Sequence, residues 1–255
     1  MANSASGDSV VDRVVRVIEA FPEGADALPL SELAERSGLP LSTAHRLVRQ
    51  LAGHGLLELG AGGDVRLGLR FWELVSRNSP AFALRQAAMP FMEDIQQVLM
   101  QNVNLGVLEG WEVLFVERLS RRGSVANRAR VAGRMPVHIS SAGLALMAHQ
   151  PQAVQAEYLR QFHDPAGKVT AGVMRQILAE THRQGFAELA AVVDPDTWGI
   201  AVPVFDGKRA VAALGVVVPL AEVRLQALVP ALQTAARGIG RALVKPGEFR
   251  STESM

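Results

Sequence analysis

One helical stretch in the first quarter of the chain gathers hydrogen-bond donors and positive charge on one side. Ala44, Leu47, Val48 and Leu51 fall at the spacing i, i+3, i+4, i+7, which predicts the buried side of a helix. The opposite side has no acidic residue and carries donors and cations: Ser42, Thr43, His45, Arg46, Arg49 and Gln50. Such a surface favours contact with DNA, and a merely solvated helix face is the alternative.

The donors on this face divide into two roles. Ser42 and Thr43 lie near the start of the helix, where backbone N–H groups favour phosphate. His45, Arg46 and Arg49 lie further along and can reach base edges. An arginine paired with guanine contributes about 1–3 kcal/mol of discrimination between bases.

The residues before this helix must hold it in position. Ser31 begins a short amphipathic run, and Gly38, which is free to take positive φ, ends that run before a Leu-Pro turn. Two short helices around a glycine turn form a helix-turn-helix, whose second helix enters the DNA major groove. Ser31 therefore joins the DNA-binding candidates.

A β-hairpin is predicted directly after the donor-rich helix. Residues 56–59 and 65–67 have strand character and flank the glycine-rich turn at residues 60–64. A hairpin in this position is the wing of a winged helix-turn-helix. Its one basic residue, Arg66, is expected to touch phosphate or the minor groove.

A second group of polar residues lies near the middle of the chain. His138, Ser140 and Ser141 follow an arginine-rich stretch, residues 120–134. The stretch is expected to be a solvated loop, a subunit interface or a site that captures an anion. Only Arg130 and Arg134 lie next to the segment around His138, so only these two arginines enter the ligand-binding prediction.

A hydrolytic enzyme is the weaker alternative for this group. His138 with Ser140 or Ser141 resembles a base and a nucleophile, and Asp194 or Asp196 would have to supply a third group. No G-x-S-x-G elbow surrounds either serine, and so short a spacing does not by itself aim a base at a hydroxyl. Capping of the helix at Ser141 is the structural alternative for the serines.

Composition narrows the class of protein. The 255 residues are 49% hydrophobic and 20% charged, which is typical of a globular chain long enough for two domains. There is no cysteine and the six histidines are scattered, so we expect no metal and no cofactor. The formal net charge of +1 disfavours a purely non-specific, ligand-independent DNA-binding protein. Neither a signal peptide nor a membrane-spanning run is evident, so a cytoplasmic location is expected.

Further elements follow from periodicity and turn residues. A short strand is expected at the start of residues 185–196, a hairpin turn at 206–208, and a kink or break at Pro90. The predicted helices span residues 10–21, 69–77, 81–101, 141–149, 152–162, 170–184 and 221–243. The predicted strands span residues 102–109, 112–119, 199–205 and 210–218. Strands bracketed by helices indicate an α+β second domain around one mixed sheet.

Five stretches in order resemble the IclR family of bacterial transcriptional regulators. They are VVDRVVRVIEAF, LSELAERSGLPLSTAHRLVRQLAGHGLLE, VRLGLRFWEL, VAGRMPVHISSAGLALMA and GIAVPVFDGKRAVAALGVVVP. The resemblance implies a winged helix-turn-helix over residues 1–68, a linker helix over 69–80, a GAF-like effector-binding domain over 81–246 and a flexible tail over 247–255. It also implies homodimers or homotetramers on palindromic operator DNA, no contact with a membrane, and a small-molecule effector.

The chain departs from the family where the effector would bind. Polar groups common in the family are replaced by Leu144, by the apolar run 189–193, and by Gly199, Gly215 and Val217. The implied pocket is more apolar than one for a small keto acid, and it suits a larger, partly aromatic or alkyl ligand or a weakened response. The effector-binding candidates are Arg130, Arg134, His138, Ser140, Ser141, Ala142, Gly143, Leu189, Gly199, Gly215 and Val217.

Overall fold

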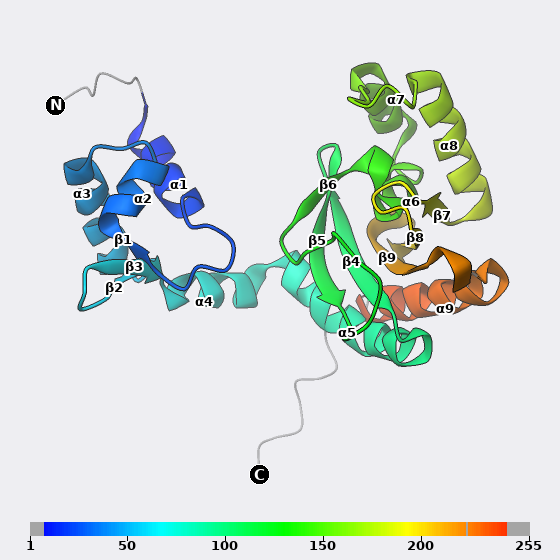
Figure 1. Cartoon of the computed structure of the whole chain (residues 1–255), viewed down its shortest axis with the longest axis horizontal. Coiled ribbons are helices and arrows are strands. Elements are labelled where there is room, and N and C mark those ends of the chain that lie inside the picture. Colours follow the sequence, from blue (N-terminus) through cyan, green and yellow to red (C-terminus); the bar gives the residue numbers. More distant parts are fainter. Residues whose placement is uncertain (1–7, 223, 244–255) are drawn as a thin grey trace, which may run out of the picture. The chain divides into compact units, whose positions relative to one another are not determined.

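The computed structural model describes residues 8–222 and 224–243, and the chain divides into two compact units, Met1–Ser79 and Pro80–Met255 (Figure 1). The tail predicted at residues 247–255 lies outside the described residues. Each unit is described by itself. Within the described residues, no helix combines the length and the apolar character that crossing a membrane would need.

The first unit is a winged helix-turn-helix, as predicted. Its elements are α1 (Val10–Glu19), β1 (Leu28–Pro29), α2 (Leu30–Arg36), α3 (Leu41–Gly53), β2 (Leu57–Leu59), β3 (Asp64–Leu67) and α4 (Leu69–Asn78). The side chain of Ser9 caps α1, accepting a hydrogen bond from the Asp12 N–H at 3.1 Å. The sequence did not indicate β1, a two-residue strand that pairs antiparallel with β3.

The turn between α2 and α3 depends on a glycine. Gly38 has φ +63°, and its N–H donates to the Glu35 carbonyl while the Leu39 N–H donates to the Ala34 carbonyl. This pair of bonds is the Schellman motif, which satisfies the last carbonyls of α2. Leu39 is buried after the turn, so the motif fixes where α3 starts relative to the core.

The end of the wing packs closely on the end of α3. The Gly68 N–H donates to the Leu56 carbonyl at 2.8 Å, and a Cβ at position 68 would lie 2.1 Å from the Gly55 carbonyl oxygen. Only glycine fits this close approach. The wing and the start of α4 are thereby fixed to the helix-turn-helix.

The second unit builds one six-stranded sheet with helices on both faces. Its elements are α5 (Pro80–Leu99), β4 (Asn102–Glu109), β5 (Glu112–Leu119), β6 (Arg134–Pro136), the 3-10 turn η1 (Val137–Ile139), α6 (Ser141–Met147), α7 (Gln152–Gln161), α8 (Ala171–Gln184), β7 (Ala187–Ala190), β8 (Thr197–Asp206), β9 (Arg209–Pro219), the 3-10 turn η2 (Leu220–Glu222) and α9 (Leu225–Leu243). The strand order is β6-β5-β4-β9-β8-β7.

The α+β class is confirmed, and the sheet is antiparallel where the sequence suggested a mixed one. All five strand pairings are antiparallel, including β4 with β9, which are far apart in the sequence. Most pairs are hairpin neighbours. The long connection through α6, α7 and α8 brings β9 beside β4 in the opposite direction, which the local pattern of either strand could not reveal.

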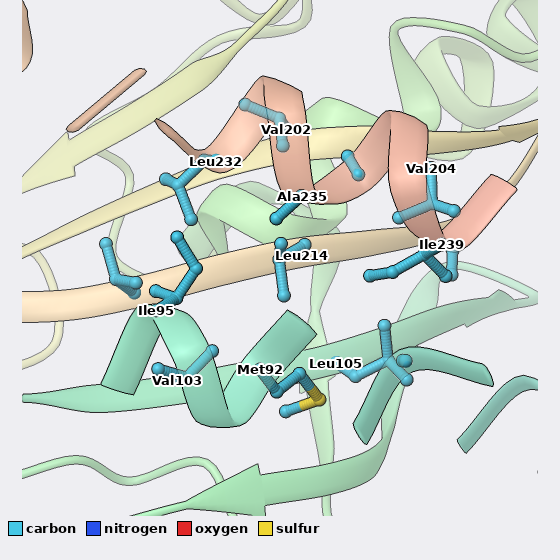
Figure 2. Packing of buried hydrophobic residues seen from close by; sticks show 14 of the residues in the cluster. Met92, Ile95, Val103, Leu105, Val202, Val204, Leu214, Leu232, Ala235 and Ile239 are labelled. Carbon is cyan, nitrogen blue, oxygen red and sulfur yellow. The ribbon is translucent and has the colours of Figure 1, made fainter. Parts of the chain in front are cut away.

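One face of the sheet forms an apolar core with α5 and α9. Figure 2 shows side chains of α5 and α9 meeting side chains of β4, β8 and β9, with Met92 and Ile95 on α5 and Leu232 and Ile239 on α9 among them. Because strand residues alternate between faces, Val103 and Leu105 point into this core while Asn102 and Asn104 belong to the other face. The other face is covered by α6, on which α8 packs.

Three predicted elements differ from the structure. The predicted break at Pro90 is absent, because α5 continues through it with Leu84, Ala88, Met92 and Ile95 buried along one side. The closing helix starts at Leu225 rather than Ala221, after the turn η2. The irregular stretch 120–134 ends in a short strand, β6, whose residues pair with β5.

Candidate DNA-binding helix and effector cavity

The structure places the predicted DNA-contacting residues on the open side of α3. Ala44, Leu47, Val48 and Leu51 are buried, as the spacing predicts. Thr43 is half-buried, and the rest of the donor face is exposed: Ser42, His45, Arg46, Arg49 and Gln50. The helix thus presents a continuous row of donors to a partner.

The cations of α3 are available for an anionic partner. Helix α3 contains no acidic residue, and no ion pair in the described part of the chain involves Arg46 or Arg49. Pro40 precedes α3 and provides no side-chain cap, so the helix start keeps N–H groups for an acceptor such as phosphate.

Two candidates lie outside α3. Ser31 is exposed in the first turn of α2. Arg66 is exposed on β3 and stands directly across from Glu58 on β2, so part of its charge is balanced within the wing. Arg46 and Arg49 are therefore the stronger electrostatic candidates.

A cavity lies on the second unit between the sheet and the segments that cover it. It holds about 610 Å³ of empty space, including its open mouth. The sheet contributes Asn104 on β4, Phe115 on β5, Gly215 and Val217 on β9 and Gly199 on β8. In the register, Gly215 faces Asn104, and Gly199 stands between Leu189 and Val217. The two glycines leave space above the strands that side chains would otherwise occupy.

Seven of the eleven predicted effector-binding residues line this cavity. They are Ser140, Ser141, Ala142, Leu189, Gly199, Gly215 and Val217. Ser140 both lines the cavity and caps α6, because its Oγ accepts a hydrogen bond from the Gly143 N–H at 3.3 Å. Ser141 Oγ would lie 3.1 Å from a Cβ at position 199, so a side chain there would crowd it.

The other four predicted residues are not among those that line the cavity. Arg134 on β6 pairs with Glu109 at the end of β4 at 3.1 Å, and Gly143 packs its backbone against Val137. Arg130 and His138 also lie outside the lining. The arginine that does line the cavity is Arg128, which the sequence-based prediction had left out of the ligand-binding residues. Leu144 is a core residue, 1% exposed, and does not reach the cavity.

Sequence reasoning did not identify which residues of the arginine-rich stretch form one wall of the cavity. Residues 120–133, here called the strap, cross the sheet and contribute Ala126, Asn127, Arg128 and Ala129 to the lining. The lining also includes Met135 and Ile139 before α6, Val192, Val193 and Asp194 between β7 and β8, and Thr197 at the start of β8. An irregular stretch has no periodicity, so the sequence offered no signal for which of its residues face inward.

His138 is engaged elsewhere. Its Nε2 lies 3.7 Å from Asp164 Oδ1, with the two side chains only 13% and 7% exposed, and its ring meets Phe162 edge to face. The Asp164 carboxylate also accepts backbone hydrogen bonds, from Ala166 at 3.0 Å among others, and these lower the pKa of Asp164. The acid beside His138 is thus Asp164, not Asp194 or Asp196, and the pair fixes the loop after α7.

A second histidine contact joins the ends of α6 and α8. The rings of His149 and His182 lie 4.8 Å apart, and His149 also meets Phe205 edge to face at 5.3 Å. Burial, and to a smaller extent the neighbouring His182, lower the pKa of His149, against the opposing effect of the Ala145 carbonyl 2.8 Å from its Nδ1. The pair therefore favours neutral His149.

Comparison with known proteins gives the family. The model of the IclR helix-turn-helix domain matches residues 10–59, and that of the bacterial transcriptional regulator IclR C-terminal domain matches residues 80–241. A crystal structure of an IclR homologue from Microbacterium hydrocarbonoxydans, complexed with 4-hydroxybenzoate, is 43% identical, covers 92% of this chain and 99% of its own, and superimposes with a TM-score of 0.85.

Two further relatives agree. An IclR homologue from Microbacterium sp. strain HM58-2 is 40% identical, covers 94% of this chain and 100% of its own, and has a TM-score of 0.61. The HTH-type transcriptional regulator XynR of Escherichia coli is 27% identical over 80% of this chain and 83% of its own length. The chain therefore belongs to the IclR family of DNA-binding transcriptional regulators, whose C-terminal domain binds an effector.

Proposed function

We propose that this regulator responds to a small aromatic carboxylic acid and reads a palindromic operator with α3 from each of two copies. The observation that carries the effector class is the lining of the cavity. Apolar side chains such as Phe115, Leu189 and Val217 offer a surface for a ring, while Arg128 offers charge for a carboxylate. The complex of a 43% identical relative with 4-hydroxybenzoate supports the same class.

Calorimetry on the purified full chain tests the effector class. We expect 4-hydroxybenzoate or benzoate to bind and pyruvate or glyoxylate not to bind, because a two- or three-carbon acid leaves the apolar walls uncovered. A Gly199→Val variant should abolish binding, since its side chain would occupy the space beside Ser141. Tight binding of pyruvate together with no binding of either aromatic acid would reject the proposal.

A gel shift with DNA selected from a random-sequence pool tests α3. Arg46→Ala should weaken binding to the selected sequence by about 1–3 kcal/mol, the range for losing an arginine–guanine pair. The matched control is Arg175→Ala, which removes an exposed arginine of α8 in the second unit and should leave affinity unchanged. Equal affinity of the Arg46 variant and the unsubstituted chain would remove Arg46 from the interface.

We further propose that two copies associate through the first unit. Helix α4 has no buried residue, and Leu69, Trp72 and Val75 follow one another along it at 72%, 60% and 46% exposure. On α1, Val11 is 69% exposed. Apolar surface left open in this way marks an association site. Two-fold pairing would match a palindromic operator. We expect a regulator that binds operator DNA to act in the cytoplasm.

A further inference from the structure

Two buried asparagines of β4 hold the strap, and they hold it differently. Asn102 is fully buried, donates from Nδ2 to the Val125 carbonyl at 2.8 Å, and accepts at Oδ1 from Ser120 Oγ at 2.8 Å and Ser124 Oγ at 3.3 Å. Asn104, two residues on and on the same face, accepts at Oδ1 from Asn127 Nδ2 at 2.9 Å. Both ends of the Asn102 amide are therefore used by the strap.

The Asn104 amide keeps one end for the cavity. Asn104 lines the cavity, and within residues 8–222 and 224–243 no group accepts a hydrogen bond from its Nδ2. Some polar atoms of the described residues are fully enclosed and lack a hydrogen-bond partner, such as Tyr158 Oη and Trp198 Nε1, but Asn104 Nδ2 is not one of them. The free end of the amide thus opens onto the space where a ligand would lie.

The orientation of that amide is set by a backbone group that can only donate. The Ala129 N–H donates to Asn127 Oδ1 at 3.0 Å, so Asn127 must turn its NH₂ group toward Asn104. Asn104 must then present its oxygen to Asn127 and its NH₂ to the cavity. A flipped Asn104 would set NH₂ against NH₂ and leave a buried donor unpaired.

We propose that Asn104 is a specificity-determining residue that donates a hydrogen bond to the carboxylate of the effector, with Asn127 as the residue that positions it. The inference rests on the aromatic acid proposed above. Arg128 follows Asn127 on the strap and lines the cavity, so charge and donor lie at the same end. Asp194 also lines the cavity. It lies in the connection from β7 to β8, so β9 and β8 separate it from Asn104 on β4. The Asp194 carboxylate can therefore accept a hydrogen bond from the hydroxyl group at the other end of the effector.

Calorimetry with 4-hydroxybenzoate and its neutral amide, 4-hydroxybenzamide, tests the polarity. The unsubstituted chain should prefer the carboxylate. Asn104→Asp places an acceptor at the cavity, so it should weaken carboxylate binding roughly 10- to 100-fold, the range for a hydrogen bond to a charged group, and shift the preference to the amide. Asn127→Asp leaves Asn104 itself unchanged, but the new carboxylate at position 127 can only accept a hydrogen bond from Asn104. Asn104 must therefore flip and turn its oxygen to the ligand.

The Asn127 variant separates positioning from packing and charge. A flipped Asn104 accepts from the NH₂ group of 4-hydroxybenzamide, so this ligand should bind more tightly than to the unsubstituted chain. Loss of packing would weaken both ligands in proportion, and charge alone would leave the amide unchanged. Ser124→Ala is the control. The Ser124 hydroxyl donates within the strap to the Arg121 carbonyl at 2.8 Å and, at 3.3 Å, toward Asn102 Oδ1, so its loss should leave the ratio of the two affinities unchanged.

The outcomes distinguish this inference from the proposed function. Binding of 4-hydroxybenzoate to the unsubstituted chain, with the preference unchanged in both aspartate variants, would overturn the role of Asn104 and leave the effector class standing. No binding of either ligand to a folded, unsubstituted chain would overturn both. Reversal of the preference in Asn104→Asp, with tighter amide binding in Asn127→Asp, supports the inference.

Discussion

Position 68 has room for a hydrogen atom and nothing larger. A Cβ there would lie 2.1 Å from the Gly55 carbonyl oxygen and 2.9 Å from its carbon, which are backbone atoms that no rotamer change can move. Gly68→Ala must therefore displace the end of the wing or the turn after α3. The wing and α3, which are the two elements proposed to contact DNA, would then no longer be held in a fixed position relative to each other.

We expect Gly68→Ala to destabilise the first unit by about 1–3 kcal/mol, the range for overpacking. Calorimetric unfolding measures this. Gly53→Ala is the control, because nothing lies within 4 Å of a Cβ there and alanine suits the helix better, so stability should stay or rise by up to about 1 kcal/mol. Equal stability of the two variants would show that the contact at position 68 relaxes freely.

The His149–His182 contact predicts a pH dependence of stability. Burial lowers the pKa of His149, so the unfolded chain binds a proton more readily than the folded one. The contribution of neutral His149 is complete above its unfolded pKa of about 6.5 and is lost as the pH falls through the lower folded pKa. The second unit should therefore unfold at lower denaturant at pH 5.5 than at pH 7.5, and His149→Gln should flatten this trend. A steeper trend in the variant would contradict it.

Side-chain roles were predictable where periodicity exposed them. The donor face of α3 followed from the spacing of Ala44, Leu47, Val48 and Leu51, and the structure buries those four residues. The choice among Arg128, Arg130 and Arg134 was not predictable, because it depends on hydrogen bonds from the strap to Asn104 and on Glu109 beside Arg134. These contacts join residues far apart in the sequence.

At the scale of elements, α5 shows how packing overrides a local rule. Pro90 removes the N–H that would bond to the Gln86 carbonyl, yet the helix runs unbroken from Pro80 to Leu99. Four buried side chains anchor it to the sheet on both sides of the proline, whose own ring is exposed. The sequence allowed a kink or a break at Pro90, and the break is prevented by contacts that the sequence does not display.

Pro90→Ala should stabilise the second unit. The change restores one helical hydrogen bond at an exposed position, and the helix-propensity difference between the two residues sets an upper limit of about 3 kcal/mol. Denaturant unfolding followed by Trp111 and Trp198 fluorescence reports on this unit. A lower denaturant midpoint for the variant would contradict this prediction. It would mean that α5 is bent at Pro90 and that the neighbouring core packs against the bent helix.

Elements were predictable according to their length. Most helices and strands of eight or more residues, such as β4 and β5, lie close to the predicted ranges because each repeats a hydrophobic period several times; the late start of α9 at Leu225 is the main exception. The two-residue β1 and the three-residue β6 are too short to show a hydrophobic period. They form strands because they pair with β3 and β5. The strap has no period at all, and this is why the cavity wall that it forms stayed hidden.

At the scale of the whole molecule, effector and operator must influence each other equally. If the aromatic acid changes operator affinity by some factor, the operator changes the affinity for the acid by the same factor. We expect a factor of about 5 to 150, which corresponds to the usual allosteric coupling free energies of about 1–3 kcal/mol. Calorimetry of 4-hydroxybenzoate binding with and without the selected DNA measures the effect of the operator on effector affinity. Gel shifts with and without the acid measure the effect of the effector on operator affinity. Unequal factors would point to a second ligand site or a change in subunit number.

Helix α4 has a consequence for how long each molecule survives. With no side chain buried, it can unwind without opening either core, and such segments exchange their amide protons early and are cut first by proteases. An apolar partner laid over Leu69, Trp72 and Val75 would shield the same backbone. Turnover would then depend on assembly: unpaired copies would be degraded at this helix, while paired copies would persist, so that the cellular pool is enriched in the form that can occupy a two-fold operator.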